Sequence, residues 1–356
     1  MRVGMKILFV TAAPGLPQMV GGSQYTSDTL IRNLIKRGHQ AQLLCGLAAH
    51  GRIGLVARAK IKLLSKKYAT DKALGYTVTR AWHPWEVMEQ AVAEIEPDVV
   101  VVLAHYAGLM ARSVAKTGRP FMMAFQDVEF GGEERDLTGV PIVPSVANSS
   151  FTASRYREKF GFSPIVIHPI IDPQQYKTVS SRTYATFINP HPEKGLETAI
   201  AIAAACPELP FLFVEGWPLK DEARKALLAR LKSLPNVQLH PSVRDMRRIY
   251  AQTNVLLAPS QWEEGYGRVA TEAQFSGIPV LGTNRGGLPE AIGPGGIILD
   301  KDATVEEWSR SLRAIWQGKS REELGRIAEM HAARPALDNQ KQIDCWIDHI
   351  ERVPLA

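Results

Sequence analysis

Hydrophobic residues along this chain occur in short runs that alternate with amphipathic segments and with loops containing glycine. Three of these runs lie within residues 5–10, 99–104 and 254–258. A nearly continuous apolar run of this length, placed between helical patterns, is typical of a strand that is buried on both faces. The pattern therefore predicts an α/β protein with parallel sheets covered by helices on both sides.

The alternation of strands and helices runs twice along the chain. The first series ends near residue 170, within a segment at 168–173 that contains two prolines, and the second series begins at residue 184. Proline does not fit regular structure, and 356 residues are many for one domain. We therefore predict one α/β domain at 1–170 and a second at 171–335.

The end of the chain has the pattern of an amphipathic helix. Ile343, Trp346, Ile347 and Ile350 recur at the spacing of one helix face, which predicts a closing helix within 336–356. An apolar stripe must be buried against another element. We expect this helix to cross back to the first domain.

The loop after the first strand precedes another amphipathic helix, predicted from Ser23 to Lys36 with Ser23 as its N-cap. Gly21 and Gly22 come just before this helix. Backbone N–H groups at the start of a helix point outward and favour anions. The two glycines are therefore a candidate anion cradle, and the alternative is that they only form the turn.

Composition narrows the class of protein. With 45% hydrophobic and 22% charged residues, the chain resembles an ordinary globular protein. The net charge of +6 suits an anionic ligand or a membrane surface, but no long Lys/Arg block indicates nucleic acid. The three cysteines are far apart and form no CxxC pair, which predicts buried free thiols in a reducing compartment and a cytoplasmic location.

A basic stretch at 52–67 has helical periodicity. A helical wheel predicts one apolar face, made of Ile53, Ala57, Ile61 and Leu64, with basic residues such as Lys62 opposite. Such a helix could lie on anionic lipid at the inner face of the membrane or contact an anionic acceptor. It could equally be a solvated helix that covers the sheet.

The stretch at 258–290 contains most of the candidate functional residues. It reads as strand, glycine loop, helix, strand and glycine loop, an order that directs several backbone N–H groups to one place. Glu264 lies in the first glycine loop, and Glu272 lies in the helix eight residues later. Amides that bind phosphate, together with carboxylates that accept hydrogen bonds from hydroxyls, favour a nucleotide-sugar site.

Six motifs occur in the order and spacing of one family. They are Gly21-Gly22, Asn148-Ser149, Ile171-Asp172, the PEKG sequence at 192–195, the two glutamates Glu264 and Glu272 separated by seven residues, and the GGLPE sequence at 286–290. On these motifs the chain resembles the retaining glycosyltransferases of family four over nearly its whole length. The resemblance implies the GT-B fold, in which two Rossmann-like domains with parallel sheets face each other across a central cleft.

The resemblance also implies roles for individual residues in the binding of a nucleoside diphosphate sugar linked to UDP or GDP. Glu272 would bind the ribose hydroxyls, and Lys194 would neutralise the diphosphate and the charge that develops as the sugar leaves. Glu264, with the backbone amides of 265–267, would contact the sugar hydroxyls and phosphates. Gly21 and Gly22 would close over the diphosphate from the other domain. The further donor-binding candidates of this domain are Gly265, Tyr266, Gly267, Arg268, His191 and Asn189.

Two positions differ from the family pattern. Asn189 stands where the family usually has an arginine that pairs with the diphosphate, so Arg268, Arg285 or Lys220 would have to substitute for it. Gln126 stands where the family often has a histidine near the reaction centre. Glutamine forms hydrogen bonds but takes up no proton at neutral pH, so activity could be slow or sugar choice unusual.

Several assignments remain open. His105 follows the strand at 99–104 and is a candidate for contact with the acceptor, which could be a small molecule, a glycan or a lipid-linked hydroxyl compound. The resemblance implies a reaction with retained anomeric configuration and without metal, and the Asp-x-Asp sequence at 300–302 is predicted to be an exposed turn.

Other functions compete with sugar transfer. One is a non-catalytic or weakly active nucleotide-sugar binding subunit, and others are an epimerase or a phosphorylase on the same fold. A nicotinamide dehydrogenase lacks support, because neither first loop contains a GxGxxG sequence.

Overall fold

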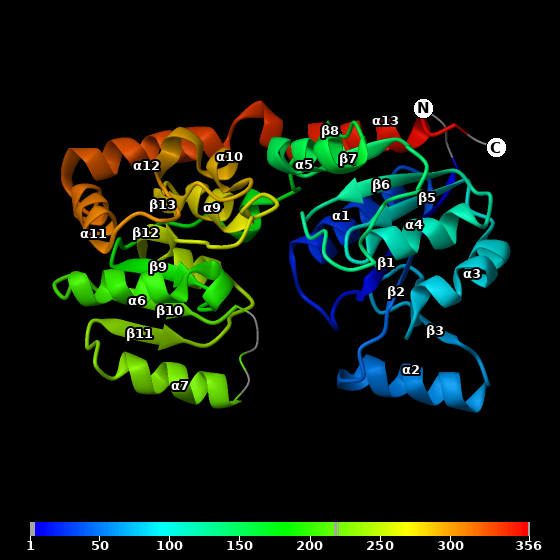
Figure 1. Cartoon of the computed structure of the whole chain (residues 1–356), viewed down its shortest axis with the longest axis horizontal. Helices are drawn as coiled ribbons and strands as arrows, with labels where there is room; N and C mark the ends of the chain where they lie inside the picture. Colours follow the sequence, from blue (N-terminus) through cyan, green and yellow to red (C-terminus); the bar gives the residue numbers. More distant parts are fainter. Residues whose placement is uncertain (1–3, 217–218, 220, 355–356) are drawn as a thin grey trace. The chain divides into compact units, whose positions relative to one another are not determined.

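The computed structural model describes residues 4–216, 219 and 221–354. The chain divides into two compact units (Figure 1). Unit 1 consists of Met1–Ile170 together with Asn339–Ala356, and unit 2 consists of Ile171–Asp338. The end of the chain therefore belongs to the same unit as its beginning.

Within the described residues, unit 1 contains an eight-stranded sheet in the order β3-β4-β2-β1-β5-β6-β7-β8. Its strands are β1 (Lys6–Pro14), β2 (Gln40–Gly46), β3 (Tyr68–Asp71), β4 (Val78–Ala81), β5 (Val99–Leu103), β6 (Phe121–Phe125), β7 (Ser145–Ala147) and β8 (Ile165–Val166). The pairs are parallel apart from β3 with β4. The continuous apolar runs thus form the buried central strands, as predicted.

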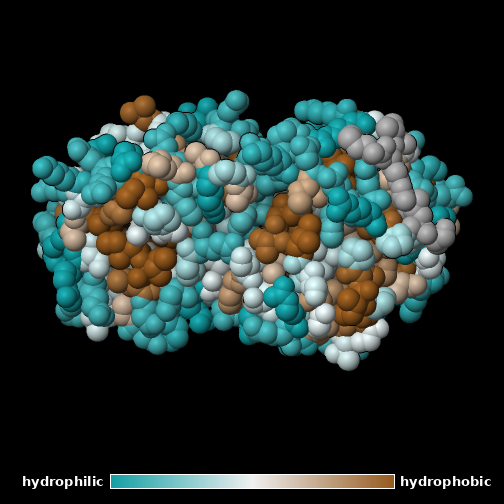
Figure 2. All heavy atoms as spheres, turned by 90° about the horizontal axis from the view of Figure 1, so that it is seen from above, coloured by the Kyte–Doolittle hydropathy of each residue, from teal (hydrophilic) through white to brown (hydrophobic). Residues whose placement is uncertain are grey.

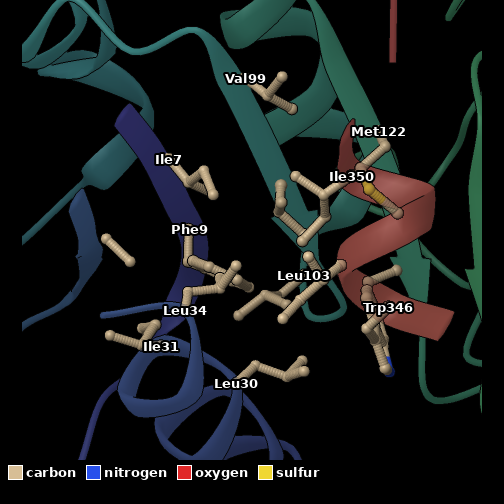
Figure 3. Close-up of a cluster of buried hydrophobic side chains, with 14 of the residues drawn as sticks. Ile7, Phe9, Leu30, Ile31, Leu34, Val99, Leu103, Met122, Trp346 and Ile350 are labelled. Carbon is tan, nitrogen blue, oxygen red and sulfur yellow. The ribbon is translucent and has the colours of Figure 1, made fainter. Parts of the chain in front are cut away.

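Helices cover both faces of this sheet. They are α1 (Gly22–Lys36), α2 (Gly51–Leu63), the 3-10 helix η1 (Pro84–Glu86), α3 (Met88–Ile95), α4 (Ala107–Ala115), α5 (Ser150–Phe160) and α13 (Asn339–Glu351). One core cluster packs α1 and α13 against the sheet. Figure 3 shows Trp346 and Ile350 of α13 beside Leu103 and Met122 of the central strands. The apolar stripe predicted at the end of the chain is therefore buried.

The first helix begins differently from the prediction. Helix α1 starts at Gly22 with Gly21 at the N-cap, and no side chain caps it. The Ser23 hydroxyl instead donates a hydrogen bond to Gln24 Oε1 at 2.9 Å. Ser23 as the N-cap was wrong, because the helix begins at Gly22 and its N-cap lies two residues nearer the N-terminus, at Gly21.

Unit 2 contains a parallel six-stranded sheet within its described residues, in the order β11-β10-β9-β12-β13-β14. Its strands are β9 (Tyr184–Ile188), β10 (Phe211–Val214), β11 (Val237–His240), β12 (Thr253–Ala258), β13 (Val280–Thr283) and β14 (Gly296–Leu299). The first strand of the series lies in the middle, and later strands are added on either side of it. This is the strand order of a doubly wound dinucleotide-binding fold.

Two core clusters lie on the two faces of this sheet. The helices are η2 (Pro173–Gln175), η3 (Pro192–Lys194), α6 (Leu196–Ala205), α7 (Asp221–Leu231), α8 (Arg247–Tyr250), α9 (Arg268–Gln274), α10 (Leu288–Ile292), η4 (Gly293–Gly295), α11 (Val305–Ala314), α12 (Gly318–Ala332) and η5 (Pro335–Leu337). Thr304 and Glu307 form a capping box at the start of α11.

The surface shows no single dominant apolar area on the face drawn in Figure 2, where hydrophobic residues form separate patches among hydrophilic ones. Among the helices of the described ranges, none is long and apolar enough to cross a membrane. Cys45 and Cys206 are buried free thiols, but Cys345 on α13 is exposed, so its predicted burial was wrong. Cys345 lies on the opposite side of that helix from the stripe that faces the sheet.

We predict that Trp346→Ala destabilises unit 1 by about 3–5 kcal/mol, because it removes a large side chain from a closed core. Trp346 is only 3% exposed. The measurement is the free energy of unfolding in urea. Cys345→Ala, on the exposed side of the same helix turn, is the matched control and should change stability by less than about 0.5 kcal/mol. Equal effects of the two substitutions would contradict this role of α13.

Candidate active site

The residues predicted to bind the donor gather at the carboxyl ends of β9 and β12. These two strands are neighbours in the sheet, but β10 and β11 lie on one side of them, and β13 and β14 lie on the other. The loops that follow β9 and β12 therefore diverge. Such a topological switch point is where open parallel sheets bind ligands.

The loop after β9 is pressed against the loop after β12. Asn189 directly follows β9 and has a left-handed backbone conformation, with φ of 65°. Its backbone N–H donates to the Val214 carbonyl at 2.7 Å. Helix η3 follows, and a Cβ atom on Gly195 would lie 1.9 Å from the carbonyl oxygen of Pro259. Because φ at Gly195 is also positive (84°), only glycine fits this approach.

This approach brings Lys194 to Glu264. The Lys194 ammonium lies 2.6 Å from Glu264 Oε1, and the Ser260 hydroxyl donates to the same oxygen at 2.9 Å. Both members of the ion pair are largely but not fully buried. A cation and a carboxylate that sequence analysis assigned to one ligand are thus in direct contact.

The backbone of Glu264 is held by the second glycine loop. The amide of Gly287 donates to the Glu264 carbonyl at 2.7 Å. A Cβ atom on Gly286 would lie 2.3 Å from that carbonyl oxygen, and φ of Gly286 is positive (63°). Glycine is required at position 286 because a side chain there would displace Glu264.

Further hydrogen bonds join the ends of three strands into one loop cluster. The amides of Gln261 and Trp262 donate to the Glu193 carbonyl at 2.9 and 3.0 Å. The Thr283 hydroxyl, at the end of β13, donates to the Ser260 carbonyl at 2.8 Å. The positions of Lys194 and Glu264 are therefore set by backbone contacts and not by the ion pair alone.

Glu272 lies on α9 and is only 7% exposed. The Tyr250 hydroxyl donates to Glu272 Oε2 at 3.0 Å, and Arg268 Nε lies 3.6 Å from Oε1. Burial raises the pKa of the Glu272 carboxyl, while Arg268 and the hydroxyls of Tyr250 and Tyr176 lower it. The sequence analysis did not identify either tyrosine, because nothing local to Glu272 indicates them.

The side chain of Tyr266, a donor-binding candidate, is buried, and its contact with a donor stays a prediction. Its ring is buried, and its hydroxyl lies 3.1 Å from Thr271 Oγ1 and accepts a hydrogen bond from Arg334 at 3.1 Å. The side chain therefore anchors the glycine loop to the core. Any contact of this position with a ligand would be made by the backbone of Gly265–Gly267.

The other donor-binding candidates of unit 2 lie in the same region. His191 is the N-cap residue of η3, and its Nδ1 lies 3.7 Å from Glu193 Oε2. Of the cations expected to substitute at Asn189, Arg285 donates to the Gln261 carbonyl at 3.2 Å and Arg268 pairs with Glu272. Lys220 lies outside the described residues.

His105 and Gln126 follow two neighbouring strands of unit 1, β5 and β6. His105 and Tyr106 both have positive φ (76° and 55°), and their rings stack with centroids 4.7 Å apart. Positive φ is uncommon in such residues and is often found at functional sites. Burial lowers the pKa of His105, and Arg135 lowers it further. His105 is therefore neutral near pH 7 and able to form hydrogen bonds.

The residue after Gln126 is Asp127, whose carboxyl is buried. The Gln126 carbonyl accepts a hydrogen bond from the Asn148 amide at 2.8 Å, and among the described residues Gln126 Oε1 is a buried acceptor without a hydrogen-bond partner. Burial raises the pKa of Asp127 to about 6, although the Glu129 amide donates to it. The sequence analysis assigned no role to Asp127. Its position soon after the buried strand β6 is the feature that could have marked it as a functional candidate.

Gly21 and Gly22 lie at the start of α1 in unit 1, whereas Lys194, Glu264 and Glu272 belong to unit 2. The closure of the two glycines over a diphosphate stays a prediction. Asp300 and Asp302 form an exposed turn after β14, in which the Asp302 amide donates to Asp300 Oδ1 at 2.9 Å. Within the described ranges, no group of three or more His, Cys, Asp or Glu side chains is arranged to hold a metal ion.

The architecture is that of the GT-B fold, with two parallel-sheet α/β units. Solved structures align over nearly the whole chain. The structure of Anabaena Alr3699/HepE in complex with UDP and glucose has a TM-score of 0.76 at 19% identity and covers 98% of this chain and 99% of that chain. WaaG, described as a glycosyltransferase involved in lipopolysaccharide biosynthesis, has a TM-score of 0.69 at 15% identity, covering 97% and 100%.

Sequence comparison finds a match in the second half of the chain. Residues 181–331 match the family model Glycosyl transferases group 1. The chain is 32% identical over 92 residues to spore coat protein SA of Bacillus subtilis (25% of this chain, 24% of that protein). It is 38% identical over 86 residues to D-inositol 3-phosphate glycosyltransferase of Paenarthrobacter aurescens (23% and 21%). The aligned segments thus span about a quarter or less of these relatives.

We predict that Asp127→Asn makes the protein more stable at pH 8 than the parent chain. The folded-state pKa of Asp127 is raised to about 6, so the folded state binds its proton more tightly than the unfolded state does. The carboxylate therefore costs stability above pH 6, and this cost disappears as the pH falls toward 4. The expected gain at pH 8 is about 1–3 kcal/mol, measured as the free energy of unfolding against pH.

Asp136→Asn is the control with the opposite sign. Hydrogen bonds from Thr138 lower the pKa of Asp136, so its carboxylate stabilises the folded state above the unfolded pKa and this contribution is lost on acidification. A gain for Asp127→Asn that is equal at pH 8 and pH 4 would contradict the pKa assignment.

Proposed function

We propose that this protein is a retaining glycosyltransferase that moves a sugar from a nucleoside diphosphate sugar to a hydroxyl group of an acceptor. The observation that carries the proposal is the Lys194–Glu264 pair, with Nζ and Oε1 2.6 Å apart. It lies at the switch point of a sheet whose residues fall within the match to the family model Glycosyl transferases group 1. Parallel sheets bind nucleotides at such a position.

The proposed donor is a UDP-linked hexose, with a GDP-linked sugar as the alternative. The Anabaena structure with the same fold contains UDP and glucose. Lys194 would contact the diphosphate, since a largely buried ammonium neutralises the charge that develops as the glycosidic bond breaks. Arg268 and Arg285 would take over the role of the arginine that Asn189 replaces.

Glu272 would hold the ribose of the donor. A carboxylate has about four lone-pair sites, and the hydroxyls of Tyr250 and Tyr176 and the Arg268 guanidinium engage it. Ribose hydroxyls would use the remaining site and replace one of these partners. The tyrosines would fix the orientation of the carboxylate before the ribose arrives, which lowers the entropic cost of binding.

Glu264 would position Lys194 and accept hydrogen bonds from the sugar hydroxyls, while the amides of Gly265–Gly267 would contact phosphate. Retention of configuration without an enzymic nucleophile requires the leaving phosphate and the acceptor to meet on one face of the sugar. The chemistry then depends on positioning and on charge stabilisation. No metal is required in this proposal, because lysine and arginine side chains supply the positive charge.

The acceptor would bind to residues of unit 1. His105, which follows β5, is neutral near pH 7. Gln126 Oε1 and the Asp127 carboxyl are buried groups that follow the neighbouring strand β6. Gln126 would form a hydrogen bond with a sugar hydroxyl near the reaction centre. Gly21 and Gly22 would contact the diphosphate. The acceptor is proposed to be a small molecule, a glycan or a lipid-linked compound, handled in the cytoplasm.

A second candidate function is a nucleotide-sugar binding subunit with little or no catalysis. Asn189 favours it, because a neutral side chain replaces the cation that the family pattern places on the diphosphate. An epimerase or a phosphorylase on this fold would give different products. Transfer of the sugar to water or to an added acceptor, followed by product analysis, separates all three from a transferase.

We predict that UDP raises the melting temperature of the protein and that Glu272→Ala abolishes this increase. The loss of two charge-assisted hydrogen bonds should weaken UDP binding by at least about tenfold. Calorimetric titration measures the same change directly. Glu197→Ala, at an exposed ion pair with Arg230 in the same unit, is the matched control and should leave UDP binding unchanged. Normal UDP binding by the Glu272 variant would remove the proposed ribose contact.

We predict that Glu264→Gln lowers the rate of sugar transfer or donor hydrolysis by about a hundredfold or more while UDP still binds. Glutamine keeps the size of the side chain but removes the charge that orients Lys194. The measurement is donor turnover under saturating UDP-glucose, compared with UDP affinity. If the parent chain binds UDP-glucose tightly but never turns it over, the non-catalytic function is correct and the transferase proposal fails.

A further inference from the structure

Helix α2 of unit 1 has two apolar sides, and only one of them is buried. Gly54 and Ala57 face the rest of the unit, where Ala57 and Ile61 pack with Leu47 and Ala69. This is a small core cluster, and Figure 1 shows α2 at the periphery of the unit beyond the edge strand β3. The inward side agrees with the face predicted from the sequence, except that Leu64 is exposed.

The other side of α2 exposes large hydrophobic residues. Leu55 is 62% exposed, and Leu63 is 82% exposed. Leu55, Ala59 and Leu63 follow each other at a spacing of four residues, so they form one outward stripe along the helix. Val56 and Leu64 add to it, with roughly half or more of each side chain exposed. The helical wheel did not identify this stripe, because it considered a single apolar face.

Basic residues flank the outward stripe. The stretch 51–70 contains six of them and no Asp or Glu, and they are Arg52, Arg58, Lys60, Lys62, Lys66 and Lys67. All six are exposed. Lys60 donates to the Thr70 carbonyl at 3.1 Å, and the Lys66 ammonium lies 6.0 Å from the centre of the Tyr68 ring. The helix and the turn after it thus present leucines among basic side chains and carry no acidic residue themselves, although Glu94 of α3 lies near Lys66.

We propose that α2 is a membrane-contact helix that binds the surface of an anionic lipid bilayer, with Leu55, Ala59 and Leu63 inserted among the headgroups. Exposed leucines gain free energy when they leave water for the acyl boundary. The flanking lysines and arginines gain from anionic headgroups at the same time. A lipid surface satisfies both kinds of side chain along the whole helix at once.

The combination of basic and apolar side chains favours an anionic bilayer over a soluble polyanion or a protein groove. A soluble polyanion would engage the basic residues but leave the leucines in water. A hydrophobic protein groove would cover the leucines but desolvate the surrounding cations at a cost. The proposal concerns a helix of unit 1, whereas Lys194 and Glu264 belong to unit 2, and it does not rest on the proposed glycosyl transfer. Its test therefore needs neither donor nor acceptor.

The test is sedimentation of the full chain with vesicles of phosphatidylcholine, with and without phosphatidylglycerol. We expect binding only to the vesicles that contain phosphatidylglycerol. High salt should weaken this binding strongly, because screening shortens the range of surface charges from about 10 Å at 0.1 M to about 3 Å at 1 M. Equal binding to both kinds of vesicle, or binding to neither, overturns the proposal.

Two pairs of substitutions assign the effect to α2. Leu55→Ser with Leu63→Ser should weaken vesicle binding by roughly tenfold for each leucine. Lys62→Glu with Lys67→Glu should weaken it by about 25-fold or more, since each lysine near an anionic surface strengthens binding by roughly fivefold. These side chains are exposed, so circular dichroism and the melting temperature should stay unchanged and show that the variants fold.

The matched controls lie on α7, an exposed helix of unit 2 that also carries acidic residues. Leu228→Ser and Lys225→Glu make the same chemical changes there and should leave vesicle binding unaltered. Weakening by the α7 variants to the same extent overturns the assignment to α2. So does full competition by soluble polyglutamate combined with unchanged binding of the leucine variant, because the surface would then be a general polyanion site.

Discussion

The contact of Gly195 with the Pro259 carbonyl is the constraint on which the candidate active site depends. A Cβ atom at Gly195 would lie 1.9 Å from that oxygen, so the loops after β9 and β12 approach as closely as two backbones can. This approach places Lys194 against Glu264 and lets the Glu193 carbonyl accept two amides of the neighbouring loop. A side chain at Gly195 would separate the loops and, with them, the charges that the proposed reaction needs.

Much of the fold could be predicted from the sequence because its strands are almost uniformly apolar. The run at 99–104 contains no polar residue, and only a strand buried on both faces needs such a sequence. The edge strand β3 was not predicted, since Tyr68–Asp71 is short, and only its first two residues are buried. The outward stripe of α2 was also not predicted, because exposed leucines cannot be distinguished from buried ones by periodicity alone.

The candidate site could be predicted only in part. Glu264, Glu272 and Lys194 stand in recognisable motifs, and the structure brings Lys194 and Glu264 into contact. The environment of Glu272 could not be predicted, because Tyr250 is 22 residues away and reaches the carboxyl through the packing of α8 against α9. The buried ring of Tyr266 was missed for a similar reason, since a residue between two glycines usually belongs to an exposed loop.

Under the proposed function, the charged residues of unit 2 would compensate for the arginine that Asn189 replaces. Cations around the switch point pair with carboxylates, and these pairs are Lys194 with Glu264, Arg268 with Glu272 and Arg285 with Glu263. The separations are 2.6, 3.6 and 3.8 Å, so Lys194 is the cation closest to its carboxylate. Each guanidinium carries five N–H donors, so in the proposed reaction both arginines would add hydrogen bonds to a diphosphate while they keep these partners. The arginines would then supply the charge that Asn189 does not, while Glu264 holds Lys194 in place.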